Sequence, residues 1–259
     1  MTRLFTLLLA VFLYGCGSVG GPAVVTPVTY NIDSALDAEK GARPRVQGGE
    51  DNGAVESMQA LISPYRAKLD ETMNRELATL ATPLKKGAPE STMGNWMADL
   101  MLAAARDLRP DLPVLFATAN SGGLRVQEIN AGPLLVSEIY EMMPFDNELV
   151  FVELTGKEVS RFVRHIADSG GWPISAGTRV VADADGMTIR VNDAFISEST
   201  KYWIALPDYV ANGGSDSDML VGKRQVSTGK LIRDLLIEYA AKAEGPIRVN
   251  GKEGRIRLE

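Results

Sequence analysis

The order of helical and strand patterns between residues 92 and 207 constrains the fold most strongly. After Thr92, which can cap a helix, apolar residues recur at spacings of three and four: Met93, Trp96, Met97, Leu100, Met101 and Ala104. The apolar run 114–118 predicts a buried strand, and residues 148–154 alternate as a second strand. Because these patterns mix without a regular strand-helix-strand repeat, we expect one α/β domain of the α+β type, with a mixed sheet and helices packed on it.

Capping and turn signals place further elements. Thr155 and Glu158 match a capping box, which predicts a helix that buries Val159, Phe162, Val163 and Ile166. A turn at 183–186 predicts a hairpin, and a short helix is expected from Ser137 to Pro144. We expect longer helices at 55–81, started or kinked by Pro64, and at 228–243. Other strands are expected at 178–182, 187–191, 201–207, 247–249 and 255–258.

The N-terminus has the pattern of an export signal. Arg3 precedes an apolar run of about 11 residues, which is too short to span a bilayer. Leu13 to Cys16 resembles the lipobox of bacterial lipoproteins, which are cleaved before the cysteine and acylated on it. The alternative is an ordinary signal-peptidase site with a free or buried cysteine. The expected parts are a lipoprotein signal peptide at 1–15, a Gly- and Pro-rich tether at 16–54 and a folded domain at 55–259.

These signals predict a protein of the bacterial cell envelope, held to a membrane by lipid on Cys16 and facing the periplasm or the cell surface. Gly17 stands where some bacteria use aspartate to retain lipoproteins in the inner membrane, which favours the outer membrane.

Composition excludes several classes of function. The net charge of −6 and the absence of a basic block argue against a nucleic-acid partner. The sequence has one histidine, His165, and one cysteine, too few for a zinc cluster, a His-containing triad or a two-metal phosphoesterase. We expect no catalytic residue, metal site or cofactor in this chain, and we interpret His165 as a surface or boundary residue.

Three loops remain as candidates for ligand binding, at 120–125, 143–147 and 209–217. Together they offer two aromatic rings, paired glycines, an arginine and short polar side chains. Aromatic rings stack on planar bases, glycines let backbone amides approach a ligand, and arginine binds phosphate through paired hydrogen bonds. This combination favours a nucleotide ligand.

The segments "STMGNWMADLM", "ANSGGLR", "MMPFDNELVFVELTGKEV" and "DYVANGGSDSDML" resemble, in this order, the C-terminal domain of 5'-nucleotidases, over about residues 55–259. The resemblance implies that Phe145 and Tyr209 sandwich a base, while Asn120 and Arg125 reach ribose and phosphate. The remaining binding residues it implies are Gly122, Gly123, Gly213, Gly214, Ser215 and Asp216.

The chain departs from the family pattern at two binding positions. Ser215 stands where the family has an aspartate for the ribose hydroxyls, with Asp216 one residue later. A phosphate-binding arginine expected upstream of the first segment is missing, and only Lys85 and Lys86 lie nearby. Ser215 also begins an S-x-x-D pattern with Asp218 that predicts a helix cap.

The family's metallophosphatase domain, which supplies divalent metals and catalytic groups, is absent from this sequence. The resemblance therefore implies the substrate-recognition part of a split 5'-nucleotidase, which acts on nucleoside monophosphates or related phosphoesters with a separately encoded metallophosphatase that holds the metals. The alternatives are a stand-alone lipoprotein that binds nucleosides or nucleotides without hydrolysis, and a scaffold that has lost binding. Whether the chain takes part in any hydrolysis depends on that partner.

Overall fold

A computed structural model describes residues 52–183, 186–250 and 253–259, with side chains from residue 57 onwards. The chain divides after Glu56 into two units, and the second, Ser57–Glu259, contains the folded domain. The expected signal peptide at 1–15, Cys16 and nearly all of the tether lie outside the described residues.

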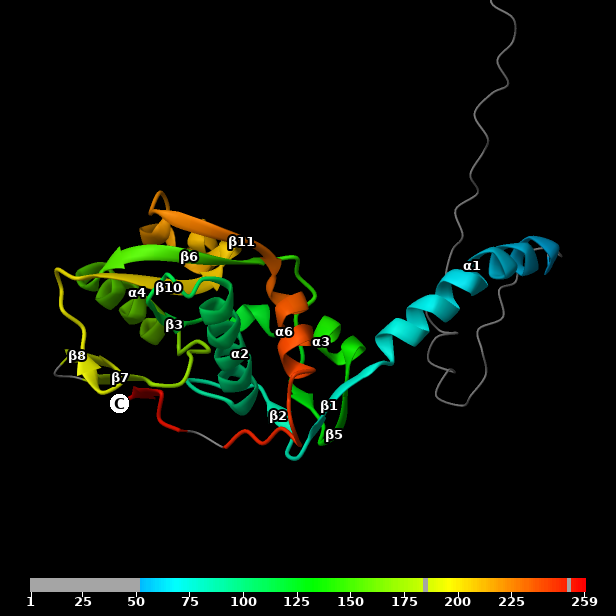
Figure 1. The fold of residues 1–259 in the computed structure, drawn as a ribbon, viewed down its shortest axis with the longest axis horizontal. Coiled ribbons are helices and arrows are strands. Elements are labelled where there is room, and N and C mark those ends of the chain that lie inside the picture. The colour runs from blue at the N-terminus through cyan, green and yellow to red at the C-terminus, as the bar shows by residue number, and fades with distance from the viewer. Residues whose placement is uncertain (1–51, 184–185, 251–252) are drawn as a thin grey trace, which may run out of the picture. The chain divides into compact units, whose positions relative to one another are not determined.

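A mixed four-stranded sheet forms the centre of the domain (Figure 1). Its order is β11 (Gln225–Leu231), β6 (Glu148–Thr155), β10 (Lys201–Pro207) and β3 (Val114–Ala117). Strand β10 runs antiparallel to β6 and parallel to β3. The α/β fold with a mixed sheet is therefore confirmed.

Strand β6 is buried on both faces because a core lies on each side of the sheet. Successive side chains of a strand point to opposite faces. Accordingly, Leu149 and Phe151 belong to one core, and Val150, Val152 and Leu154 to the other.

Helices cover both faces of this sheet. The first core contains residues of α2 (Thr92–Leu108), α3 (Val136–Met142) and α6 (Ile232–Ala240), and Figure 1 shows α2 and α6 side by side. The second core contains α4 (Gly156–Asp168), whose predicted buried face is confirmed. Its predicted capping box is also confirmed, since Glu158 N donates to Thr155 Oγ1 and Thr155 N donates to Glu158 Oε2.

A second sheet has the order β12 (Ile256–Leu258), β7 (Thr178–Asp183), β8 (Gly186–Val191) and β9 (Ala194–Phe195). Asp183 pairs with Gly186, which confirms the predicted hairpin. Two small antiparallel pairs complete the strands: β1 (Glu76–Leu80) with β5 (Gly132–Leu135), and β2 (Leu84–Lys85) with β4 (Glu128–Ile129).

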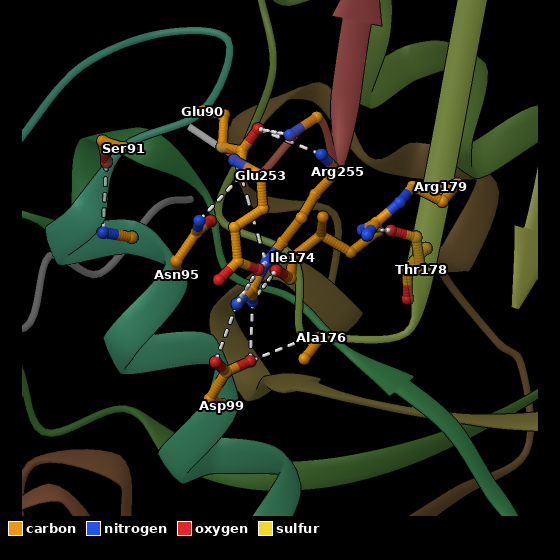
Figure 2. Close-up of polar contacts among 12 residues, drawn as sticks. Glu90, Ser91, Asn95, Asp99, Ile174, Ala176, Thr178, Arg179, Glu253 and Arg255 are labelled. Atoms are coloured by element: carbon orange, nitrogen blue, oxygen red, sulfur yellow. Dashed lines mark hydrogen bonds and ion pairs between the residues drawn. The ribbon is translucent and has the colours of Figure 1, made fainter. Parts of the chain in front are cut away.

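A buried arginine joins the C-terminal strand to α2 (Figure 2). Arg255, 2% exposed, makes two hydrogen bonds to the Asp99 carboxylate, of 2.6 and 2.8 Å, and one of 2.9 Å to the Ile174 carbonyl oxygen. Burial disfavours its charge, but hydrogen bonding to Asp99 raises the pKa of the guanidinium above its ordinary value. The neighbouring Glu90 carboxylate accepts hydrogen bonds from the backbone amides of residues 253–255.

Two of the expected helices are wrong at one end. The helix expected at 55–81 is α1 (Asn52–Met73), which continues through Pro64, and residues 76–80 instead pair with β5 as strand β1. The helix expected from 228 begins only at Ile232, because Gly229 has a φ of +66°, which a right-handed helix excludes. The preceding residues form β11 on the edge of the central sheet.

Smaller differences occur elsewhere. The N-cap of α2 is Ser91, whose Oγ accepts from Gly94 N, while Thr92 Oγ1 accepts from Lys85 N. Residues 247–249 form no strand, and Ile247 makes an isolated bridge to Leu80. No helix in the described part of the chain combines the length and apolar character needed to cross a membrane.

Candidate functional site

The topology of the central sheet brings the three candidate loops to one edge. The carboxyl ends of β3 and β10 meet there because these strands are parallel, and the amino end of antiparallel β6 joins them. Asn120–Arg125 follows β3, residues 143–147 precede β6, and Tyr209 follows β10. Loops that are far apart in the sequence thus become neighbours.

A cavity of about 340 Å³ lies between these loops. This volume falls within the range of small-molecule sites. The cavity is lined by Asn120, Gly122, Gly123, Arg125, Phe145, Asn147, Tyr209 and Ser215. Of the residues predicted to bind ligand, Gly213, Gly214 and Asp216 lie outside this lining. Asn147 is an addition that the sequence analysis missed, although it lies two residues after Phe145 in the same motif.

Both predicted rings are open to solvent. Phe145 is 38% exposed and Tyr209 is 50% exposed, and both side chains line the cavity. Large aromatic side chains usually bury their faces in the interior. Two partly exposed rings beside one cavity therefore form a surface on which a flat molecule can stack.

The polar groups of the cavity have unused bonding capacity. Asn120 is 7% exposed, yet its Oδ1 has no hydrogen-bond partner among the described residues. An unpaired buried acceptor costs free energy, which a ligand donor would relieve. Arg125 has no carboxylate within ion-pair distance in the described part of the chain, and its guanidinium carbon lies 5.7 Å from the centroid of the Phe145 ring.

The two lysines near the first loop already have partners. Lys86 Nζ donates to the carbonyl oxygen of Leu124 at 2.8 Å, which supports the loop just before Arg125. Lys85 Nζ lies 3.3 Å from Glu128 Oε1. In this structure neither lysine lines the cavity.

The loop after Tyr209 owes its shape to its glycines and to two strained residues. Gly213 has a φ of +97°, and Ser215 and Asp216 have φ of 54° and 58°, in the left-handed region that non-glycine residues rarely adopt. A Cβ atom on Gly214 would lie 2.5 Å from the Tyr209 ring, so only glycine lets this ring lie against the backbone. The predicted cap is wrong: Ser217, not Ser215, precedes the short helix η5 (Asp218–Leu220), and its side chain makes no capping bond.

His165 fixes the same loop. Its Nε2 lies 2.9 Å from the carbonyl oxygen of Ser215, and its ring packs edge-on against Trp172 with 5.4 Å between centroids. Tyr209 Oη also accepts a hydrogen bond from Ser215 N. The half-buried histidine is thus a structural support of the cavity wall. Among the described residues, no group of His, Cys, Asp and Glu could hold a metal ion.

The chain is similar to longer bacterial proteins of known family. The chain is 24% identical over 225 residues to the protein UshA of Yersinia enterocolitica, covering 83% of this chain and 40% of UshA. It is 28% identical over 195 residues to the 5'-nucleotidase of Vibrio vulnificus, covering 73% of this chain and 34% of that protein. The chain therefore spans less than half the length of these relatives.

Solved structures show the same fold. The 5'-nucleotidase precursor of Thermus thermophilus superimposes with a TM-score of 0.65 at 25% identity, over 82% of this chain and 44% of that one. The NAD nucleotidase of Haemophilus influenzae gives a TM-score of 0.62 at 17% identity, over 87% and 45%. The model of the family "5'-nucleotidase, C-terminal domain" matches residues 76–222, more than half of the chain. The protein therefore belongs to the 5'-nucleotidase C-terminal domain family.

Proposed function

We propose that this domain recognises a nucleoside monophosphate and presents it to a separately encoded metallophosphatase. The observation that carries the proposal is the joint position of Phe145, Tyr209, Asn120 and Arg125 around one cavity. In this arrangement the two rings stack on the base, which contributes about 1–3 kcal/mol per base. Membership of a 5'-nucleotidase family supports a nucleotide as the ligand.

Each remaining cavity residue has a role that suits its chemistry. Arg125 is cationic and unpaired within the described residues, so it can bind phosphate through two hydrogen bonds. Asn120 lines the cavity, so its side-chain amide is the candidate partner of a ribose hydroxyl, and the Asn147 amide can donate to and accept from the edge of a base. Ser215, on the wall beside Tyr209, is the nearer candidate for the ribose, because Asp216 does not line the cavity.

The need for a partner follows from the chemistry of hydrolysis. Two-metal phosphate hydrolysis uses clustered histidine and carboxylate ligands, and the 259 residues contain one histidine. Nε2 of that histidine is engaged with Ser215. The proposed partner supplies the divalent metals, the attacking hydroxide and the acid.

Calorimetry and co-purification test this proposal. Titration of the full chain with AMP is expected to show binding, and protein co-purified from membranes is expected to release phosphate from AMP only when divalent metal is present. AMP binding without any associated phosphatase would favour a stand-alone binding protein. Absence of binding with and without the co-purified partner would contradict the proposal.

The proposal also places the protein in the cell envelope, held by lipid on Cys16, with the outer membrane as the preferred location. The support is the apolar run and lipobox-like pattern that precede this cysteine. Metabolic labelling with a palmitate analogue is expected to mark the wild type and not Cys16→Ala. Equal labelling of both proteins, or none of either, would contradict the anchor.

A further inference from the structure

The carboxylate of Asp208 joins the two loops that carry the aromatic rings. Its Oδ1 accepts a hydrogen bond from Glu148 N at 3.0 Å and another from Tyr209 N at 2.8 Å. Glu148 directly follows the Phe145 loop (143–147) as the first residue of β6, and Tyr209 carries the second ring. A single oxygen atom therefore bonds both the backbone at the start of β6, next to the Phe145 loop, and the backbone at Tyr209.

The end of the strand pairing explains why a side chain is needed here. The antiparallel pairing of β10 with β6 ends where Pro207 faces Leu149. Beyond this pair the chain leaves the sheet and forms the short helix α5 (Asp208–Ala211). The Glu148 amide has no ladder partner on that side, and Asp208 supplies the missing acceptor.

The Phe145 loop is also held from its other side. Ile232 N donates to the Asn147 carbonyl oxygen at 2.9 Å, and Arg233 bonds the Asp146 carboxylate at 2.7 Å. These contacts fix the loop to α6, but they do not reach Tyr209. The Asp208 carboxylate is the described contact that relates the backbone of one ring-bearing loop to that of the other.

We propose that Asp208 is a positioning residue that sets the spacing of Phe145 and Tyr209 for a nucleoside base. It does not line the cavity, so it acts through the two backbone amides and not by touching the ligand. The inference rests on the proposed function, since it assigns these rings to the base. It adds that the position of the acceptor atom, and not the negative charge of Asp208, determines base affinity.

Three substitutions separate position from charge. Asp208→Asn keeps an Oδ1 acceptor at the same place and removes the charge, while Asp208→Glu keeps the charge and displaces the acceptor by one methylene. Asp208→Ala removes both. We expect the affinity for adenosine to fall about tenfold in the Ala and Glu variants and to stay close to wild type in the Asn variant. Adenosine is chosen because it is uncharged.

Glu90→Gln is the matched control for a general loss of stability. Glu90 also accepts backbone amides, at residues 253–255, but it does not line this cavity. This variant is expected to lower the melting temperature and to leave adenosine affinity unchanged. Isothermal titration of the full-length variants gives the affinities, and circular dichroism checks their folding. If Asp208→Ala fails to fold, the comparison of the Asn and Glu variants still decides the question.

Two binding results would overturn the inference: wild-type affinity in the Ala and Glu variants, or equal losses in the Asn and Glu variants. Hydrogen exchange at the Glu148 and Tyr209 amides tests it without a ligand. Both amides are expected to exchange faster in Asp208→Glu and at the wild-type rate in Asp208→Asn. If wild-type protein binds no adenosine, the proposed function fails, whereas unchanged exchange in Asp208→Glu would refute the positioning role itself.

Discussion

Arg255 and Arg125 occupy opposite surroundings in the same domain. Arg255 is buried, and Asp99, Glu253 and the Ile174 carbonyl oxygen satisfy its guanidinium (Figure 2). Arg125 is exposed beside a cavity and has no ion-pair partner among the described residues.

The same contrast extends to neighbouring groups. Hydrogen bonds from Asn95 and from three backbone amides overcome the effect of burial and lower the pKa of Glu90 below its ordinary value. At the cavity, buried Asn120 Oδ1 lacks any described partner. The first region uses its polar groups to hold the C-terminal strand in place. In the second, Arg125 has no ion-pair partner and Asn120 Oδ1 has no hydrogen-bond partner among the described residues.

The largest expected effect is on stability and comes from Arg255→Ala. The substitution removes the buried guanidinium and leaves the Asp99 and Glu253 carboxylates, which are about a third exposed, without it, so we expect the free energy of unfolding to fall by up to about 3–5 kcal/mol. Chemical denaturation followed by tryptophan fluorescence measures the loss. Arg257→Ala, at an exposed position in the adjoining strand β12, is the control. Equal stability of the two variants would show that the buried contacts of Arg255 do not stabilise the fold.

The next effect concerns ligand affinity. Phe145→Ala and Tyr209→Ala are each expected to weaken AMP binding by about 1–3 kcal/mol through lost stacking. The melting temperature should change little for Phe145→Ala, whose ring is partly exposed, and more for Tyr209→Ala, whose hydroxyl also accepts a hydrogen bond from Ser215 N. Phe195→Ala removes a ring that is 65% exposed and lies outside the cavity, and it should change neither quantity. Unaltered AMP affinity in both cavity variants would mean that the rings do not hold the base.

Arg125→Ala tests whether Arg125 binds the phosphate or the nucleoside part of the ligand. We expect AMP affinity to fall about tenfold and adenosine affinity to stay unchanged, since only AMP carries the phosphate. Calorimetric titration with both ligands measures the difference, and Arg164→Ala, on the exposed side of α4, serves as the control. Equal losses for AMP and adenosine would show that Arg125 supports the cavity and does not bind phosphate.

The smallest expected effect is on stability at the ion pair of Glu158 and Lys223. Its exposure is intermediate between that of buried Arg255 and that of exposed Arg125. Hydrogen bonds, first from Lys223 and then from Thr155, lower the pKa of Glu158 from 4.5 to about 2. A lowered carboxyl pKa stabilises the fold fully above pH 4.5, and this stability is lost as the pH falls from 4.5 toward 2. Glu158→Gln should therefore be less stable than wild type at pH 7 by less than about 1 kcal/mol, with a smaller difference near pH 2. Urea denaturation at both pH values measures the stability difference between the two proteins. An equal difference at both pH values would show that protonation of Glu158 is not coupled to unfolding.

Local signals were sufficient for the elements whose ends are marked in the sequence. The helix at α4 was predicted with its cap and buried face because Thr155, Glu158 and the apolar spacing all lie within one segment. Strands β1 and β11 were missed as strands because their conformation depends on partners far away in sequence, β5 and β6. Only Gly229, within β11, carried a local signal against a helix.

The candidate site shows the same division. The loops at 120–125, 143–147 and 209–217 could be selected from residue types and motif order, and the sheet then brings them together. The contacts of His165 with Ser215 and of Asp208 with Glu148 could not be predicted, because each spans at least 50 residues. The S-x-x-D pattern failed because Ser215 adopts a left-handed conformation, in which it does not precede a helix.

The backbone at Gly214 packs against the Tyr209 ring, so the two aromatic rings of the cavity have different surroundings. A Cβ atom at residue 214 would lie 2.5 Å from the Tyr209 ring, so the backbone at Gly214 limits movement of this ring toward it. Phe145 lies in a segment without regular secondary structure, and rotation of its side chain requires no displacement of backbone at Gly214. In the proposed function, a bound base would therefore meet one ring that packs against backbone, Tyr209, and one ring in an irregular segment, Phe145.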